Sequence, residues 1–182
     1  MAGETASDRR GAATWVALLT GASAATTLVL ACATPFAALA ALAATRMRPR
    51  AGLALMTLAW LASQAIGFGV LNYPRDPRTL AWGAAMLTAA LGAVAAARWG
   101  AGRVRSGAAA LATGFGAGFV AYKLVLLGWS FVLGGVHTAL SSYWTVRQFG
   151  REALILAGLV ALYRVLVALG VPAARQGKVA WA

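Results

Sequence analysis

Residues 14–45 read TWVALLTGASAATTLVLACATPFAALAALAAT, a continuous apolar run whose division into helices decides the fold. One helix of this length would measure about 48 Å, too long for an upright crossing of a hydrocarbon core of about 30 Å. Thr34-Pro35 offers a break, because proline suits the first turn of a new helix and threonine can cap it. We therefore predict two helices, at about 14–32 and 35–46. The second, about 18 Å long, should thin the bilayer, tilt its neighbours or stay partly re-entrant.

The composition of the whole chain is that of a membrane protein. Of 182 residues, 61% are hydrophobic and 11% charged, against roughly 25% charged in soluble domains, and the mean hydropathy is +0.75. Further apolar stretches lie at about 51–71, 79–98, 107–134 and 149–171, each near or above the roughly 20 residues of a membrane helix. None alternates with the period of a barrel strand. The sequence predicts an all-α integral membrane protein, with six transmembrane helices in one domain over residues 1–182.

The basic residues favour six helices over five. The formal charge is +12, from 16 Lys and Arg against 4 Asp and Glu. Six helices with a cytoplasmic N-terminus place on the inner side Arg9, Arg10, Arg46, Arg48, Arg50, Arg98, Arg103, Arg105, Arg175 and Lys178, and on the outer side Arg75, Arg78, Arg147 and Arg151. Five helices would divide them without a useful bias. The positive-inside rule thus predicts both termini in the cytoplasm, with the charges on lipid headgroups and not on nucleic acid.

The N-terminal run has a second interpretation. Arg9-Arg10, the apolar stretch and the small residues at 31–33 resemble a secretory signal peptide, and residues 29–32 are a poor match to a lipoprotein cleavage box. Cleavage would leave five helices and remove the charge bias. The intact mass of the purified protein distinguishes the two cases.

In the six-helix topology three polar segments face outward: the turn at 32–34, the loop NYPRDPR at 72–78, and residues 136–152. Two prolines stiffen the loop, and rigid loops present ligand groups at a lower entropic cost. We expect Tyr73 to cap a ligand there and Asp76 to pair with Arg75 or Arg78. Below the loop lie two deep polar residues, Gln64 and Lys123, and an ionisable group within a membrane helix is a functional candidate. The expected ligand-binding residues are Gln64, Phe68, Asn72, Tyr73, Arg75, Asp76, Arg78, Trp82, His137, Tyr143 and Trp144.

The chain shows no pattern of a catalyst. Its predicted helices carry no Asp, no carboxylate pair and no phosphate loop. We therefore expect no enzyme activity, no catalytic residues and no catalytic cofactor. The single cysteine, Cys32, excludes an internal disulfide, and Cys32 and His137 are the candidate metal ligands.

Small residues recur at four-residue spacing and allow helix backbones to approach closely. One ridge consists of Ala17, Gly21 and Ala25, another lies along residues 85–97, and Gly114 and Gly118 form a third. Such ridges serve either internal packing or the docking of another protein. The first ridge is our candidate for partner docking.

The stretch QAIGFGVLNYPRDPRTLAWG, Gln64–Gly83, together with six short Ala-rich helices and the absence of an ATPase motif, resembles the BtuM-type family of cobalamin-binding proteins. These are solitary substrate-binding (S) components of energy-coupling factor transporters. The resemblance implies capture of a corrinoid, cobalamin or cobinamide, at the outer ends of the helices. It also implies docking on a coupling subunit with its ATPases. In some relatives a cysteine ligates cobalt; here only Cys32 is present, outside the resembling stretch.

Two other functions fit the sequence. The small-residue ridges and the lack of catalytic groups suit a structural or assembly subunit of a larger membrane complex. Lys123 suggests a channel or carrier for a small ion.

Overall fold

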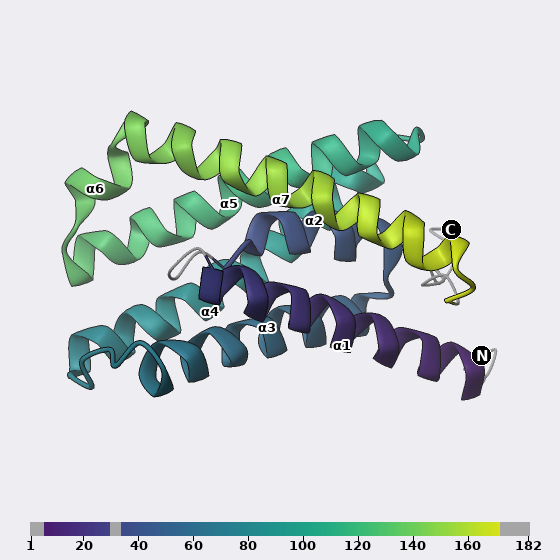
Figure 1. Cartoon of the computed structure of the whole chain (residues 1–182). Coiled ribbons are helices and arrows are strands. Elements are labelled where there is room, and N and C mark those ends of the chain that lie inside the picture. Colours follow the sequence, from purple (N-terminus) through teal and green to yellow (C-terminus); the bar gives the residue numbers. More distant parts are fainter. Residues whose placement is uncertain (1–5, 30–33, 172–182) are drawn as a thin grey trace.

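The computed structural model describes residues 6–29 and 34–171, and the side chains of 11–25 and 34–171. Figure 1 shows an all-helical bundle, and the described residues form no strand. The elements are α1 (Ala6–Val29), α2 (Phe36–Arg46), α3 (Pro49–Gly69), α4 (Pro77–Gly102), α5 (Gly107–Leu133), α6 (Val136–Leu140) and α7 (Ser142–Ala168). The all-α prediction is confirmed, and so is the division of the first apolar run into two helices.

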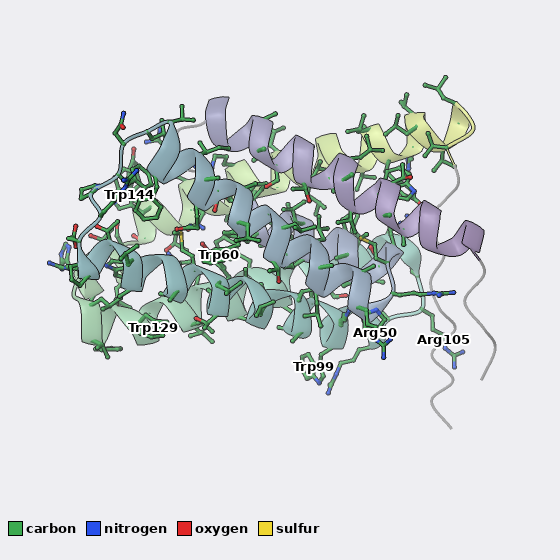
Figure 2. All side chains as sticks on the ribbon, turned by 90° about the horizontal axis from the view of Figure 1, so that it is seen from below. Arg50, Trp60, Trp99, Arg105, Trp129 and Trp144 are labelled. Atoms are coloured by element: carbon green, nitrogen blue, oxygen red, sulfur yellow. The ribbon has the colours of Figure 1, made fainter. Side chains whose placement is uncertain are left out.

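The bundle has two distinct ends. In Figure 1 α6 and the α3–α4 connection lie together at the left, which we call the α6 end. The start of α1 and the end of α7 lie together at the right, which we call the terminal end. Figure 2 shows Trp144 at the α6 end, and Trp99, Arg50 and Arg105 at the terminal end. Tryptophan and arginine at the ends of a bundle are typical of the headgroup regions of a bilayer.

Three helices, α3, α4 and α5, are long and apolar enough to cross a membrane, with mean hydropathies of 1.5, 1.7 and 1.6. Large apolar side chains point out of the bundle from these helices and from α7. Val132 of α5 is 78% exposed, and Leu154 of α7 is 75% exposed. Such surfaces suit lipid better than water. The number of six spans stays a prediction.

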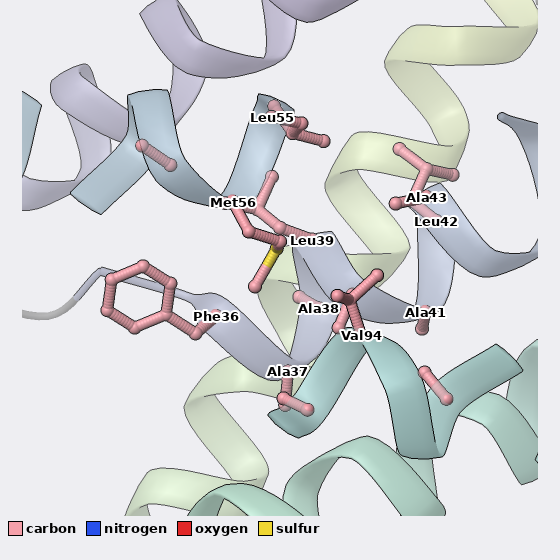
Figure 3. Close-up of a cluster of buried hydrophobic side chains, with 14 of the residues drawn as sticks. Phe36, Ala37, Ala38, Leu39, Ala41, Leu42, Ala43, Leu55, Met56 and Val94 are labelled. Atoms are coloured by element: carbon pink, nitrogen blue, oxygen red, sulfur yellow. The ribbon is translucent and has the colours of Figure 1, made fainter. Parts of the chain in front are cut away.

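The short helix α2 lies inside the bundle. Every residue from Phe36 to Ala43 is at most 1% exposed, and α2 packs against α3, α4, α5 and α7. Figure 3 shows its side chains among Leu55 and Met56 of α3 and Val94 of α4. Because protein and not lipid surrounds α2, its 11 residues create no mismatch with the bilayer. The expectation that α2 thins the membrane or tilts its neighbours is therefore wrong, because it assumed that α2 faces lipid.

Charged side chains from other helices hold both ends of α2. At its start, the amides of Ala37 and Ala38 donate to Oε2 of Glu152 at 2.8 and 3.3 Å. At its end, Nη2 of Arg98 donates to the carbonyl oxygen of Met47 at 2.8 Å. These contacts satisfy backbone groups that a helix leaves unpaired. They also place a carboxylate at the positive end and a guanidinium at the negative end of the helix dipole.

The prediction that Thr34 caps this helix is wrong. The residue at the N-cap is Pro35, and no side-chain cap is made there. Glu152 of α7, 115 residues away from Ala37, supplies the acceptor instead. A capping partner so distant in the chain leaves no local signal in the sequence.

Small residues bring α4 and α5 together. A Cβ atom on Gly114 or Gly118 would lie 3.2 Å from a backbone oxygen of α4, and Ala85, Ala89, Ala93 and Ala97 of α4 are fully buried. These two ridges therefore serve internal packing. Ala17, Gly21 and Ala25 of α1 are exposed instead. Trp60 and Trp129 donate to the carbonyl oxygen of Gly83 and the hydroxyl of Thr88 on α4, and Figure 2 shows Trp129 toward the α6 end.

The segment at 136–152 is not a loop. Residues 136–140 form α6, and α7 begins at Ser142, seven residues before the predicted start of the last helix. The polar residues of this segment thus stand on helical turns. Their spacing along α7 determines which of them face inward.

Candidate ligand pocket at the α6 end

A pocket of about 540 Å³ opens at the α6 end. It lies where the start of α4, the second half of α5, α6 and the first turns of α7 converge. Its lining consists of Arg78, Trp82, Lys123, Leu126, Gly134, Gly135, Thr138, Ala139, Trp144, Arg147, Gln148 and Arg151. Several of the rim residues, including Arg78 and Arg147, are exposed, so the pocket is accessible from outside the bundle.

One face of α7 forms a wall of the pocket. Trp144, Arg147, Gln148 and Arg151 follow the spacing i, i+3, i+4 and i+7, which places them on one side of a helix. Arg147 lies over the Trp144 ring, with its guanidinium carbon 5.6 Å from the ring centroid. The wall therefore combines aromatic surface with two guanidinium groups.

Another part of the lining is formed by two glycines that connect α5 to α6. Gly134 and Gly135 have φ angles of 85° and 95°, a region that side chains other than glycine rarely adopt. A Cβ atom on Gly134 would lie 2.7 Å from Nη2 of Arg78, and one on Gly135 would lie 3.9 Å from the Trp82 ring. The connection thus passes directly over Arg78 and Trp82 at the start of α4.

Lys123 forms the deep part of the lining. It lies ten residues before Leu133, the last residue of α5, and so about 15 Å from the end of that helix. The residue is half-buried. Lys123, which the sequence indicated as a functional candidate within a membrane helix, thus lies in the lining of this pocket.

The pocket lining carries four cationic residues, Arg78, Lys123, Arg147 and Arg151, and no acidic residue. None of them forms an ion pair in the described part of the chain. The Nε atom of Arg151 is buried and has no hydrogen-bond partner among the described residues. The pocket is therefore strongly positive and retains unused donors.

Three of the predicted ligand-binding residues, Arg78, Trp82 and Trp144, line this pocket. Three others, Gln64, Phe68 and Tyr73, belong to the contact between α3 and its neighbours. The Gln64 side-chain oxygen lies against Gly83, and the Tyr73 ring lies against Gly67. The rings of Phe68 and Tyr73 meet edge to face, with centroids 6.1 Å apart.

The α3–α4 loop has mainly a structural role in the described contacts. Asn72 has a φ of 53°, and it is exposed, as is Arg75. Asp76 caps α4: Oδ1 accepts from the Thr79 amide at 2.9 Å and Oδ2 from the Thr79 hydroxyl at 2.8 Å. These two hydrogen bonds lower the pKa of the Asp76 carboxyl below its ordinary value. The expected pairing of Asp76 with Arg75 or Arg78 is wrong: these described residues form no ion pair, and the carboxylate binds Thr79 instead.

The remaining predicted residues lie near the rim or outside the described residues. His137 is exposed on α6, beside Thr138 of the lining. Tyr143 packs on Trp144, with ring centroids 5.3 Å apart, and accepts from Arg147 at 3.5 Å. Cys32 lies outside the described residues, and no three His, Cys, Asp or Glu residues within them gather into a group that could hold a metal ion.

The ligand-binding residues predicted from the sequence did not include Arg147, Gln148 and Arg151, which line the pocket. The two arginines were interpreted as topology signals, because the segment before residue 149 was predicted to be a loop. Their helical spacing with Trp144 could have identified the wall, had the last helix been extended to Ser142.

The lining offers cations, which can hold an anionic group, and indole rings, which can pack on an organic one. Comparison of the chain with protein-family models, with curated proteins and with solved structures finds no match.

Proposed function

We propose that the chain is a membrane-embedded substrate-binding protein that takes a corrinoid, cobalamin or cobinamide, from the outer side of a bacterial inner membrane. The observation that supports this proposal is the pocket at the α6 end. It joins two tryptophans to polar groups in one cavity of about 540 Å³. Small-molecule sites commonly combine an apolar wall with a few polar groups in this way. The resemblance of Gln64–Gly83 to the BtuM-type family is the reason for proposing a corrinoid as the ligand.

The size of the pocket suggests how such a ligand would sit. Cavities of about 300–1,000 Å³ hold drug-sized molecules, so a corrinoid would insert one part and leave the rest at the rim. Exposed residues at the α6 end would then meet the remainder. His137, Tyr143 and the α3–α4 loop residues Asn72 and Arg75 are available there.

The sequence carries no nucleotide motif, so the energy for transport would come from elsewhere, and the resemblance to the BtuM-type family implies a coupling partner. The exposed ridge Ala17, Gly21 and Ala25 on α1 is our candidate surface for a coupling subunit with its ATPases. Gly21 has no heavy atom of another element within 4 Å of the position a Cβ would take. A helix of the partner could therefore approach the α1 backbone closely.

The direct test is to purify the protein after growth with cobalamin, record a visible spectrum, and titrate the protein with cobalamin and cobinamide by calorimetry. A coloured protein, or saturable binding of either corrinoid, is expected. A colourless protein that binds neither would refute the proposal.

A second candidate is a non-catalytic subunit of a larger membrane complex, favoured by the same exposed ridge on α1. It predicts co-purification with a stoichiometric partner and no bound ligand. Rescue of growth by the isolated gene in a mutant that lacks corrinoid uptake would argue against this candidate.

A further inference from the structure

We propose that the pocket at the α6 end is a phosphate site, in which Arg78, Lys123, Arg147 and Arg151 hold the phosphate group of the ligand. This inference rests on the proposed function as a substrate-binding protein and adds the chemical class that the pocket selects. It follows from the charges, donors and rings of the lining.

The first step is the charge of the empty pocket. Four cationic side chains from three different helices line one cavity, and no carboxylate lines it. Only two carboxylates have described side chains, and both are engaged elsewhere: Asp76 caps α4, and Glu152 holds α2 and Gln148. Like charges in a site of reduced dielectric repel one another. An anionic ligand would remove this repulsion.

The second step is the number of donors. Three guanidinium groups and one ammonium present many N–H donors, and the buried Nε of Arg151 has no partner among the described residues. A carboxylate has one charge and two oxygens. A phosphate monoester has a charge of about −1.5 to −2 at pH 7 and three acceptor oxygens, so it satisfies more of the lining. Arginine also matches the geometry of phosphate with paired hydrogen bonds.

The third step is the position of the charges. Arg78 and Arg147 are exposed, whereas Lys123 and Arg151 are partly buried. This order would guide an anion from the rim to the depth of the pocket. Trp82 and Trp144 flank the same cavity and offer flat surfaces to the organic part of a phosphate ester.

Two sources could supply the phosphate: a water-soluble phosphate ester or the headgroup of an anionic lipid. Cobalamin belongs to the first class through the phosphodiester of its nucleotide, which carries one negative charge and two free oxygens and therefore satisfies fewer of these donors than a phosphate monoester would. Cobinamide lacks this group. The phosphate is common to both sources, and the experiment separates them.

The test uses the full chain in a phosphate-free, non-ionic detergent, with inorganic pyrophosphate as the soluble probe and tryptophan fluorescence as the readout. We expect saturable binding, weakened about tenfold or more by Arg78→Gln, Arg147→Gln or Lys123→Met, since each removes one buried or rim charge contact. Arg105→Gln, at the terminal end, is the matched control and should bind as the wild type does. Arg78 and Arg147 are exposed, so their substitution tests the site without disturbing the core.

The second arm measures lipid in nanodiscs, with phosphatidylglycerol compared with phosphatidylcholine by native mass spectrometry. Retention of phosphatidylglycerol that Lys123→Met abolishes, without pyrophosphate binding, would assign the site to a lipid headgroup. Binding of pyrophosphate would assign it to a soluble ester. If neither binds the wild type, or if the charge variants bind as tightly as the wild type, the phosphate site is refuted.

The corrinoid titrations separate this inference from the proposed function. Tighter binding of cobalamin than of cobinamide, with the difference lost in Arg147→Gln, would support both. Equal affinities that no charge variant changes would refute the phosphate site and leave corrinoid binding intact. Pyrophosphate binding without any corrinoid binding would refute the corrinoid proposal and leave the phosphate site intact.

Discussion

Glu152 is the residue whose replacement tests the central feature of the fold, the enclosed helix α2. Its side chain is 1% exposed, so bulk water does not reach its contacts with α2 in the wild type. Glu152→Ala would leave the amides of Ala37 and Ala38 without their acceptor. A hydrogen bond to a charged group contributes about 1.5–3 kcal/mol, and a charge at a partly buried helix end up to about 2 kcal/mol.

These terms overlap, and we expect Glu152→Ala to lower the free energy of unfolding by about 3–5 kcal/mol, the range for breaking a buried charge contact. Glu152→Gln keeps an acceptor oxygen and loses only the charge, so we expect about 1–2 kcal/mol. For a chain of this size 1 kcal/mol corresponds to about 2–4 °C. The alanine variant should therefore melt about 6–20 °C below the wild type.

The assay is thermal unfolding in detergent, followed by circular dichroism. Leu154→Ala is the matched control on the same helix, because Leu154 is 75% exposed and contributes little to the core. Its melting temperature should stay close to that of the wild type. If Glu152→Ala also melts within about 2 °C of the wild type, Glu152 does not hold α2 and the reasoning fails.

Three further changes probe the packing, the pocket and the α4 cap. Gly118→Ala would place a Cβ 3.2 Å from a backbone oxygen of α4 and should lower stability by about 1–3 kcal/mol, whereas Gly116→Ala, in open space on the same helix, should not. Gly134→Ala would place a Cβ 2.7 Å from Nη2 of Arg78, so the guanidinium would have to move. We expect this change to weaken binding of pyrophosphate severalfold in a fluorescence titration. The pKa of Asp76 is lower in the folded protein than in the unfolded chain, where it is about 3.9. The charged cap therefore contributes its full stability to the folded protein at pH values above the unfolded pKa, and this contribution is lost as the pH falls through the folded pKa. Asp76→Asn, which can still cap α4, should remove this part of the acid sensitivity in melting curves measured against pH.

The sequence predicted the helices better than their surroundings. Hydropathy and the break at Thr34-Pro35 were enough to divide residues 14–45 into two helices. They could not show that α2 is enclosed, because a buried apolar helix and a short membrane helix have the same composition. Enclosure depends on Glu152 and Arg98, which contact α2 from 115 residues and 51 residues away. Local sequence contains no signal for such distant partners.

Only part of the pocket lining was predicted, because the sequence did not show which polar residues face the same cavity. Arg78, Trp82 and Trp144 were recognised as ligand candidates by their polar or aromatic character near the ends of apolar runs. The residues of the α3–α4 loop were predicted to bind a ligand for the same reason. In the structure Asp76 caps α4, and Tyr73 packs against α3. Polarity shows which residues avoid lipid. Only the helical phase shows which of them face a common cavity.

The first turns of α7 serve both the pocket and the core, and this determines how the site must be tested. Gln148 lines the pocket and donates to Oε1 of Glu152 at 3.2 Å; Arg151 lines the pocket and is adjacent to Glu152 in the chain. A substitution at either position can therefore weaken ligand binding directly or by moving the carboxylate that holds α2. Arg78 and Arg147 have no described contact with Glu152. Loss of binding in their variants, with an unchanged melting temperature, would therefore report on the pocket alone.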